Sequence, residues 1–315
     1  MIRYGIIGCG NIGTKRILSM HKDKNSKLEF IVGPPKKTNS DCNGVKLAKK
    51  FGCKFTTNRK ILLNSDIDAV ILSTGPTLFK KIGIEILNSN KHLLIEKPLG
   101  VNLSDAKKLT ELAQKKKLVL KTGFNLRFDD AIMKVKKIID KKTIGKIYFI
   151  KSTYVNGSVK TNKNKVGALS DIGSHSLNLL EFFLGKKINN FFCQKISHEH
   201  KKDDNGFIII KTKKILSYIH FSFVRWKNKF SLEISGEKGY IKVESLPKWG
   251  RQTLILGKRV FPSGKPVIKK YFFHGDNSWY NEWIHFKKLV KTKNLSSNTE
   301  GLSNMLIVDR INKKN

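Results

Sequence analysis

Acidic residues are scarce in this chain of 315 residues: 24 Asp and Glu stand against 62 Lys and Arg, which leaves a formal net charge of +38. Such an excess is typical of proteins that bind nucleic acid or an anionic membrane. The basic residues are nearly all lysines, however, and they are spread along the whole sequence, with Lys115–Lys117 as the longest run. This spread favours a compositional bias of exposed positions over a polyanion-binding surface. An anionic small substrate is compatible with both interpretations.

Cysteines are few as well, and the four of them, Cys9, Cys42, Cys53 and Cys193, form no C-x-x-C pair. Their spacing predicts neither a zinc site nor a disulfide framework, so we expect reduced thiols and no bound metal. Long apolar runs are missing too, since no stretch reaches the roughly 18 residues of a membrane-spanning helix. The first residues, MIRYGIIGCG, start directly as a strand without a basic and then apolar leader. These absences favour a soluble, cytoplasmic protein without a membrane partner.

Strand and helix patterns alternate over the first third of the chain. Apolar runs predict strands at 2–7, 28–32, 69–74, 92–96 and 118–124, and helical patterns follow the glycines at 8–13 and cover 45–51, 79–89 and 104–117, the last with Ser104 as its N-cap. This alternation implies βαβ units and a parallel sheet. The chain length implies about two domains.

The pattern changes near residue 145. Short alternating runs cover 146–155, 188–200, 206–213, 215–224, 229–235, 239–245, 252–257 and 267–273. Turn residues such as Asp204-Asn205-Gly206 separate them, which predicts a mostly antiparallel sheet. Two helical segments, 279–290 and 300–311, end the chain, and the sequence shows no internal repeat or low-complexity linker.

The segment GCGNIG at 8–13 is a G-x-G-x-x-G motif between the first strand and the first helix. Gly8 permits the tight turn, Gly10 lets the backbone approach a pyrophosphate, and Gly13 allows close packing of helix on strand. The helix N-terminus then faces the anion. In this context the motif predicts a dinucleotide site, which includes Asn11 and Ile12, over a purely structural glycine turn.

The second strand lacks the carboxylate that usually holds the ribose 2′-hydroxyl of NAD, because it ends in IVGPPKK at 31–37. Without that acid a 2′-phosphate is not repelled, and Lys36 or Lys37 could neutralise one. The sequence therefore leaves NAD and NADP open, with a slight lean to NADP or to dual use. The alternative is that both lysines are simply solvated.

The run LLIEKPLG at 93–100 ends abruptly in Glu96, Lys97 and Pro98. The carboxyl ends of parallel strands open the ligand crevice of such a sheet. There Lys97 can donate to a cofactor or substrate oxygen, Glu96 can fix its ammonium, and Pro98 restricts the backbone. We assign these three residues to the cofactor site rather than to a surface ion pair, together with Ser73 and Thr74 at the end of the preceding strand.

These motifs together resemble the Gfo/Idh/MocA family, the relatives of glucose–fructose oxidoreductase and inositol dehydrogenase. The similarity runs through GCGNIG at 8–13, DIDAVILST at 66–74, KHLLIEKPLG at 91–100, GFNLRFDDAI at 123–132, GALSDIGSHSLNLL at 167–180 and GEKGYIKV at 236–243. The resemblance implies an α/β fold: a Rossmann domain with a doubly wound parallel sheet at 1–122, then an α+β domain at 123–315 with a large, mostly antiparallel open sheet for substrate binding and oligomerisation. The C-terminal helices are free to pack back on the first domain. It also implies hydride transfer between NAD or NADP and a sugar or polyol.

Three catalytic residues follow from the resemblance. Lys97 matches the family's lysine that contacts the reacting hydroxyl, and Asp171 and His175 match its D-x-G-x-H segment. On a helix, residues four apart lie on one face, so Asp171 and His175 can point into the same cleft. A histidine suits proton abstraction from an alcohol because its pKa lies near neutrality.

The sequence also departs from the family pattern. Asn178 replaces a second aspartate, and Phe79 replaces a histidine after the third strand. These changes bear on substrate and cofactor choice more than on the reaction. We assign Asn178, and Asn125 and Arg127 just past the domain junction, to substrate binding alongside Lys97 and His175.

Two other histidine positions attract attention. His198-Glu199-His200 looks like a metal cluster, but it runs into a Lys-Lys-Asp-Asp-Asn-Gly turn, so we interpret it as a solvated hairpin end. His220 is the off-face residue of an alternating strand.

The sequence thus predicts a cytoplasmic NAD(P)-dependent oxidoreductase acting on a secondary hydroxyl or ketone of a sugar, sugar phosphate or nucleotide sugar. The resemblance suggests a homodimer or homotetramer through the open sheet, and no motif indicates a specific nucleic-acid partner. Two alternatives stay open. One is an NAD-dependent glycosidase of the same family, and the other is a non-enzymatic protein that senses a dinucleotide.

Overall fold

The computed structural model describes residues 1–34, 42–159, 166–185 and 187–314. The chain forms two compact units, one of Met1–Asn125 with Trp279–Leu306 and one of Leu126–Ser278 with Ile307–Asn315. None of the helices in these ranges is long and apolar enough to cross a bilayer.

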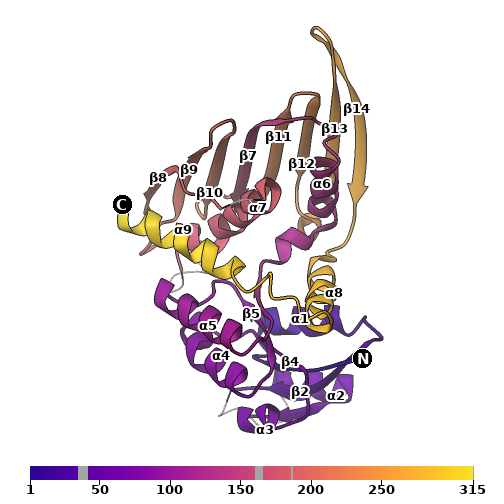
Figure 1. The fold of residues 1–315 in the computed structure, drawn as a ribbon, viewed down its shortest axis with the longest axis vertical. Coiled ribbons are helices and arrows are strands. Elements are labelled where there is room, and N and C mark those ends of the chain that lie inside the picture. The colour runs from indigo at the N-terminus through magenta and orange to yellow at the C-terminus, as the bar shows by residue number, and fades with distance from the viewer. Residues whose placement is uncertain (35–41, 160–165, 186, 315) are drawn as a thin grey trace. The chain divides into compact units, whose positions relative to one another are not determined.

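The first unit is built on a six-stranded sheet in the order β3-β2-β1-β4-β5-β6, and each of its strand pairs is parallel (Figure 1). Its strands are β1 Ile2–Ile7, β2 Ser26–Val32, β3 Lys54–Thr56, β4 Ala69–Leu72, β5 His92–Glu96 and β6 Leu120–Gly123. Its helices are α1 Asn11–Met20, α2 Asn43–Phe51, α3 Arg59–Leu63, α4 Phe79–Asn88, α5 Leu103–Lys115, α8 Ser278–Lys291 and the start of α9 Glu300–Lys314. The strand order reverses between β1 and β4, which is where a doubly wound sheet binds its ligand.

Both faces of this sheet are covered by apolar helix faces. One core cluster joins the sheet to α1, α2 and α8 through Ile17, Leu47 and Trp283. The other joins it to α3, α4 and α5, with Ile86 and Leu109 among its members. Burial on both faces explains why the strands read as continuous apolar runs. The predicted parallel sheet is confirmed.

Three short or weakly patterned elements are not predicted from the sequence: β3, α3 and α6 Asp130–Asp140. The proposed Ser104 N-cap was wrong. The α5 helix begins at Leu103, and the side chain of Asn102 accepts a hydrogen bond from the Asp105 backbone N–H at 2.9 Å. Asn and Ser are equally good caps, so local propensity did not decide between the two positions.

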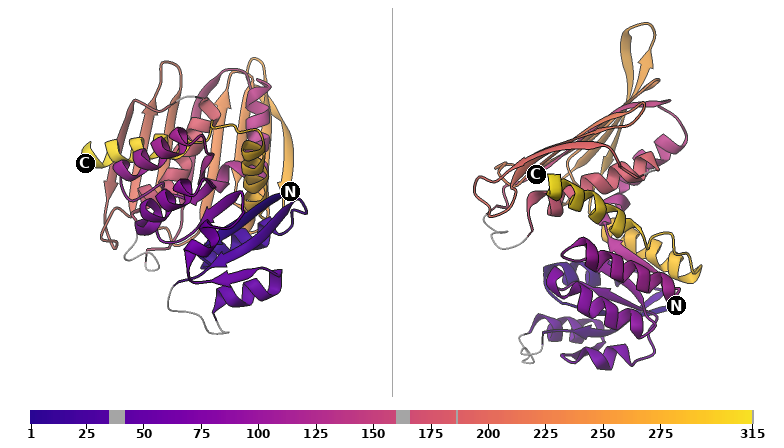
Figure 2. Two further views of the ribbon diagram at one scale, coloured as in Figure 1. Left: turned by 60° about the horizontal axis from the view of Figure 1, so that its bottom comes forward. Right: turned by 60° about the vertical axis from the view of Figure 1, so that its left-hand side comes forward.

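The second unit contains an eight-stranded sheet in the order β14-β13-β12-β11-β7-β10-β9-β8 (Figure 1), and Figure 2 shows this unit from two further sides. Its strands are β7 Ile147–Val155, β8 Phe191–Ile196, β9 Asn205–Lys211, β10 Leu216–Ser222, β11 Lys229–Gly236, β12 Gly239–Glu244, β13 Gln252–Val260 and β14 Gly264–Phe273. β7 and β10 pair in parallel, whereas the other pairs of this sheet are antiparallel. The predicted mostly antiparallel sheet is therefore confirmed.

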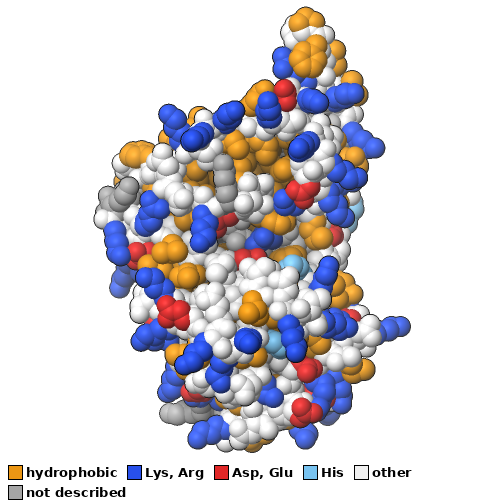
Figure 3. Space-filling view, viewed as in Figure 1, with side chains coloured by type: hydrophobic (Ala, Val, Ile, Leu, Met, Phe, Trp, Pro, Cys, Tyr) orange, Lys and Arg blue, Asp and Glu red, His pale blue; other side chains and the backbone are white. Residues whose placement is uncertain are grey.

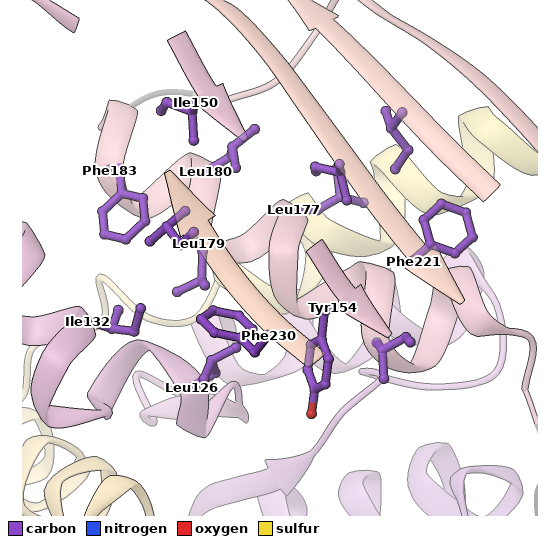
Figure 4. Close-up of a cluster of buried hydrophobic side chains, with 14 of the residues drawn as sticks. Leu126, Ile132, Ile150, Tyr154, Leu177, Leu179, Leu180, Phe183, Phe221 and Phe230 are labelled. Atoms are coloured by element: carbon purple, nitrogen blue, oxygen red, sulfur yellow. The ribbon is translucent and has the colours of Figure 1, made fainter. Parts of the chain in front are cut away.

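One face of this sheet packs against α6 and α7 Ser174–Leu184. Figure 4 shows the cluster, in which Leu177 and Phe183 of α7 lie with Ile150 and Phe230 of the sheet. The strands alternate between this core and the opposite face, as in β9, where Ile208 and Ile210 are buried and Phe207 is exposed.

Candidate active site

The glycine loop follows β1 directly, and its three glycines have different surroundings. Gly8 has φ +103°, and a Cβ there would lie 2.7 Å from the backbone of Ser73. A Cβ on Gly13 would lie 2.0 Å from the Gly8 carbonyl oxygen, so the helix could not pack this closely with any side chain. A Cβ on Gly10 meets no atom of the described residues within 4 Å, because this glycine faces outward. Two glycines thus shape the turn, and the third leaves its backbone open to a ligand.

The N-terminus of α1 is arranged for an anion. Gly10 occupies the N-cap position with no side chain to satisfy the first N–H groups, and the first turn carries no acidic residue. Such an end binds phosphate through its free N–H groups and its partial positive charge. Asn11 and Ile12, both exposed, continue the loop.

Two side chains from neighbouring elements hold the loop. The Ser73 hydroxyl donates to the Gly8 carbonyl at 2.7 Å. The Asn43 amide donates to the Cys9 carbonyl at 2.6 Å and to the Thr14 hydroxyl at 3.0 Å. Ser73 is thus a loop support as well as a predicted cofactor residue, with the half-buried Thr74 beside it. The role of Asn43 in holding the loop is not predicted from the sequence, because nothing in its local pattern relates it to a loop 34 residues upstream.

The residues present fit a dinucleotide, since the turn, the close helix–strand packing and the open Gly10 backbone are the three features that a pyrophosphate needs. Lys36 and Lys37, assigned to a 2′-phosphate, lie outside the described residues. β2 ends at Val32 without a carboxylate before Pro34.

Glu96, at the end of β5, points into the first unit. The residue is 8% exposed, and its carboxylate accepts a hydrogen bond from Arg16 Nε at 2.5 Å. Arg16 Nη1 donates to Glu282 of α8 at 3.0 Å, and its guanidinium lies 4.7 Å from the centroid of the Trp279 ring. Glu96 is predicted from the sequence to bind the cofactor and to fix Lys97, whereas its described ion pair is with Arg16.

The same buried cluster includes Lys121 of β6. Its ammonium donates to Glu300 at 2.8 Å and lies 4.0 Å from Glu282. Burial raises the pKa of Glu282, an effect that the charges of Arg16 and Lys121 oppose. This cluster is not evident from the sequence, because Glu282 and Glu300 lie on the C-terminal helices, far along the chain from Arg16, Glu96 and Lys121.

The half-buried Lys97 follows this anchored glutamate, and the buried Pro98 comes next, with a cis peptide bond between them. The carboxyl end of β5 therefore presents one partly accessible lysine, beside a carboxylate already held by an arginine.

In the second unit, Asp171 and His175 lie on consecutive helical segments. Asp171 belongs to a π-helical turn, Leu169–Gly173, and His175 to the first turn of α7. The α-helical spacing assumed for this pair therefore applies only from Ser174 onward. Single π turns of this kind are frequent at functional sites. His175 is 9% exposed, and its ring lies 6.1 Å from that of Tyr154, centroid to centroid.

Asn178 lies one turn beyond His175, and three residues of spacing put the two on one helix face. It is 2% exposed, and within the described ranges its Oδ1 has no hydrogen-bond partner. A buried acceptor left unmatched costs about 1–3 kcal/mol, so the position suits a ligand or an ordered water.

Asn125 and Arg127 lie in the short helix Asn125–Phe128, and the Arg127 guanidinium stacks 4.4 Å from the centroid of Phe182.

The histidine-rich loop is organised by one aspartate. The Asp204 carboxylate accepts from the backbone N–H groups of His198, Glu199 and His200 at 2.7, 2.7 and 3.1 Å. The part of the chain that the structure describes contains no group of three or more His, Cys, Asp or Glu placed to hold a metal.

His220 stacks on Phe207 with 4.5 Å between centroids, and burial, with Arg225 and Lys229 nearby, lowers its pKa to about 4.

Comparisons with known proteins agree with this geometry. Residues 2–124 match the model described as "Oxidoreductase family, NAD-binding Rossmann fold", and residues 132–242 match the "GFO/IDH/MocA C-terminal domain". The chain belongs to the Gfo/Idh/MocA family. The resemblance seen in the sequence motifs is confirmed.

The chain is 25% identical to a myo-inositol 2-dehydrogenase of Thermotoga maritima over 200 residues, which cover 61% of this chain and 58% of that protein. It is 26% identical to oxidoreductase P35 of Formosa agariphila over 258 residues, which cover 76% and 78%. The chain thus spans less than two thirds of the length of the myo-inositol relative.

Solved structures share the fold along the whole chain. A levoglucosan dehydrogenase in complex with NADH has a TM-score of 0.87 at 18% identity, covering 99% of this chain and 96% of that one. A variant of KijD10, a 3-ketoreductase from Actinomadura kijaniata, in complex with TDP-benzene and NADP has a TM-score of 0.77 at 18% identity, covering 99% and 97%. At these identities the likeness shows the fold alone.

Proposed function

We propose that this member of the Gfo/Idh/MocA family transfers a hydride between NAD(P) and a secondary hydroxyl or ketone of a sugar-type substrate. The observation that carries the proposal is the glycine loop, in which Gly8 and Gly13 leave no room for a side chain while the N-terminus of α1 stays uncapped. The names of the relatives support it, since they include dehydrogenases of inositol and levoglucosan and a 3-ketoreductase.

Lys97 and His175 have complementary tasks in this proposal. The bound dinucleotide supplies or accepts the hydride. The Lys97 ammonium donates to the reacting oxygen and stabilises negative charge on it, while His175 takes the hydroxyl proton during oxidation or returns it during reduction. Asp171 and Asn178 orient the substrate hydroxyls, and Asn125 and Arg127 are further substrate contacts.

For the cofactor we propose a slight preference for NADP, or use of both dinucleotides, because no carboxylate follows β2 to repel a 2′-phosphate. Titrating NADH and NADPH by fluorescence tests both parts of the proposal. Failure of both to bind would reject the oxidoreductase function. A preference for NADH of tenfold, about 1.4 kcal/mol, would reject only the lean to NADP.

We further propose a homodimer or homotetramer. The face of the eight-stranded sheet opposite α6 and α7 exposes large apolar side chains on β8, β9 and β10, among them Phe192, Phe207, Ile209 and Leu216. Contiguous apolar patches of this kind mark association surfaces. Light scattering after gel filtration gives the oligomeric state directly, and a monomer at micromolar concentration would contradict the proposal.

A cytoplasmic location and the lack of a specific nucleic-acid partner also stay predictions. Lys and Arg side chains are scattered over the face drawn in Figure 3 and do not gather in one patch.

A further inference from the structure

Lys248 lies against two aromatic rings in the second unit. It belongs to the short helix Pro247–Trp249, which follows β12. Its ammonium donates to the Tyr154 hydroxyl oxygen at 3.0 Å and lies 5.6 Å from the Tyr154 centroid and 4.9 Å from that of Trp249. A cation held over two aromatic faces and by a hydrogen bond has a defined position even on an exposed residue.

This lysine still has donors to offer. The Lys248 side chain is exposed, and its described contacts are with the Tyr154 hydroxyl and the rings of Tyr154 and Trp249. An ammonium carries three N–H donors, and the Tyr154 hydroxyl accepts from one of them. Since that phenol oxygen acts as an acceptor toward Lys248, its own O–H is available to donate elsewhere.

Tyr154 connects this lysine to the proposed catalytic histidine. The tyrosine is 6% exposed, and its ring packs against His175 at 6.1 Å, Phe230 at 5.7 Å and Trp249 at 6.0 Å. Figure 4 shows its phenol oxygen pointing away from the labelled apolar side chains. One rigid ring therefore contacts the imidazole and also bears the hydroxyl that holds the ammonium.

We propose that Lys248 and Tyr154 form a subsite for an anionic substituent, a carboxylate or a phosphate, of the sugar-type substrate. The ammonium and the phenol O–H both donate to the anion, and Trp249 supplies an apolar wall beside it. This inference rests on the proposed function, because it takes the reacting oxygen of the substrate to be at His175. It narrows the substrate class to sugar acids or sugar phosphates.

The test compares D-glucose with D-glucuronate and D-glucose 6-phosphate, which differ from it by one anionic group. Binding is measured by calorimetry and by tryptophan fluorescence, without a dinucleotide. At least one anionic sugar should bind tenfold or more tightly than D-glucose, and the two anionic compounds distinguish a carboxylate from a phosphate subsite. Lys248→Met should abolish this difference, and Tyr154→Phe should reduce it.

Matched variants make the test specific. Lys258→Met removes another exposed lysine of the same sheet, on β13, and should keep the full preference. In Trp249→Phe the fluorescence change on binding should disappear, because this indole is the ring beside the proposed anion site. Equal binding of the three sugars, no binding by any of them, or a preference that survives in Lys248→Met would overturn the subsite.

A separate titration with NADPH and NADH distinguishes this failure from that of the proposed function. If the protein binds a dinucleotide but does not prefer the anionic sugars, only the proposed subsite is rejected. If the protein binds neither dinucleotide, the proposed oxidoreductase function is rejected, and the subsite, which rests on that function, is rejected as well.

Discussion

Arg16 donates to Glu96 at 2.5 Å from a position 80 residues upstream, and both side chains are buried. The glutamate that precedes the proposed catalytic lysine is therefore fixed from inside the first unit. Glu282, contributed by α8, holds the other side of the same guanidinium.

Replacing Arg16 by Met should destabilise the protein strongly. The change removes the cation that faces Glu96 and Glu282, and a buried carboxylate without its partner costs about 3–5 kcal/mol. The loss is measured as a change in the free energy of unfolding in urea. Arg3→Met is the control, because Arg3 pairs with Asp66 at the surface, where solvent screening leaves an ion pair little effect on stability. Equal losses of unfolding free energy in the two variants would show that the buried ion pair contributes no more to stability than the surface pair.

Gly10→Ala should separate cofactor binding from folding. The added methyl group meets no described atom, so the melting temperature should stay near that of the wild type, while affinity for dinucleotide should fall at least tenfold. Gly75→Ala is the control, since its Cβ also finds space and it lies outside the loop. Gly13→Ala should lower both stability and affinity. A Gly10→Ala protein that binds NADPH normally would remove this glycine from the cofactor site.

Lys97→Met and His175→Ala should lower turnover by about 10²–10⁴, the usual size of a general acid–base contribution. Cofactor affinity should stay within a few-fold, because the glycine loop holds the dinucleotide. Arg16 continues to neutralise Glu96 in Lys97→Met, so this variant should fold normally. Stability, cofactor affinity and turnover are measured on the same samples. Folded variants with undiminished turnover would exclude these residues from the mechanism.

Asp129 should make folding less favourable as pH rises. Burial raises its pKa to about 6 from 3.8, against the opposing hydrogen bonds from Ile132 and Gln252. The folded state therefore holds the proton more tightly than the unfolded state. This contribution is favourable at low pH and is lost as pH rises from about 4 through 6.

Asp129→Asn keeps the N-cap acceptor for α6 and removes the charge. The variant should be more stable than the wild type at pH 7, by up to about 3 kcal/mol, and the advantage should vanish near pH 4. Chemical denaturation at several pH values measures this difference. Asp140→Asn, an exposed carboxylate paired with Lys136, should leave the pH dependence unchanged. A constant offset between Asp129→Asn and wild type at all pH values would reject the assigned pKa.

Local sequence determined most elements of this protein and the chemistry of its loops. The run 2–7 followed by GCGNIG requires a strand, a tight turn and a helix because each glycine acts on its immediate neighbours. The alternating runs after residue 145 likewise predict strands, since burial on one face needs only a period of two.

Tertiary structure decided which distant side chains meet. Arg16 and Glu282 are 266 residues apart, and Tyr154 and Lys248 are 94 apart, so no local period relates the members of either pair. The partners are brought together by the addition of α8 to the first unit and by the strand order of the second sheet. A charged or aromatic residue looks the same in sequence whether it ends in water or against such a partner, because only the packed fold removes the water and fixes the distance.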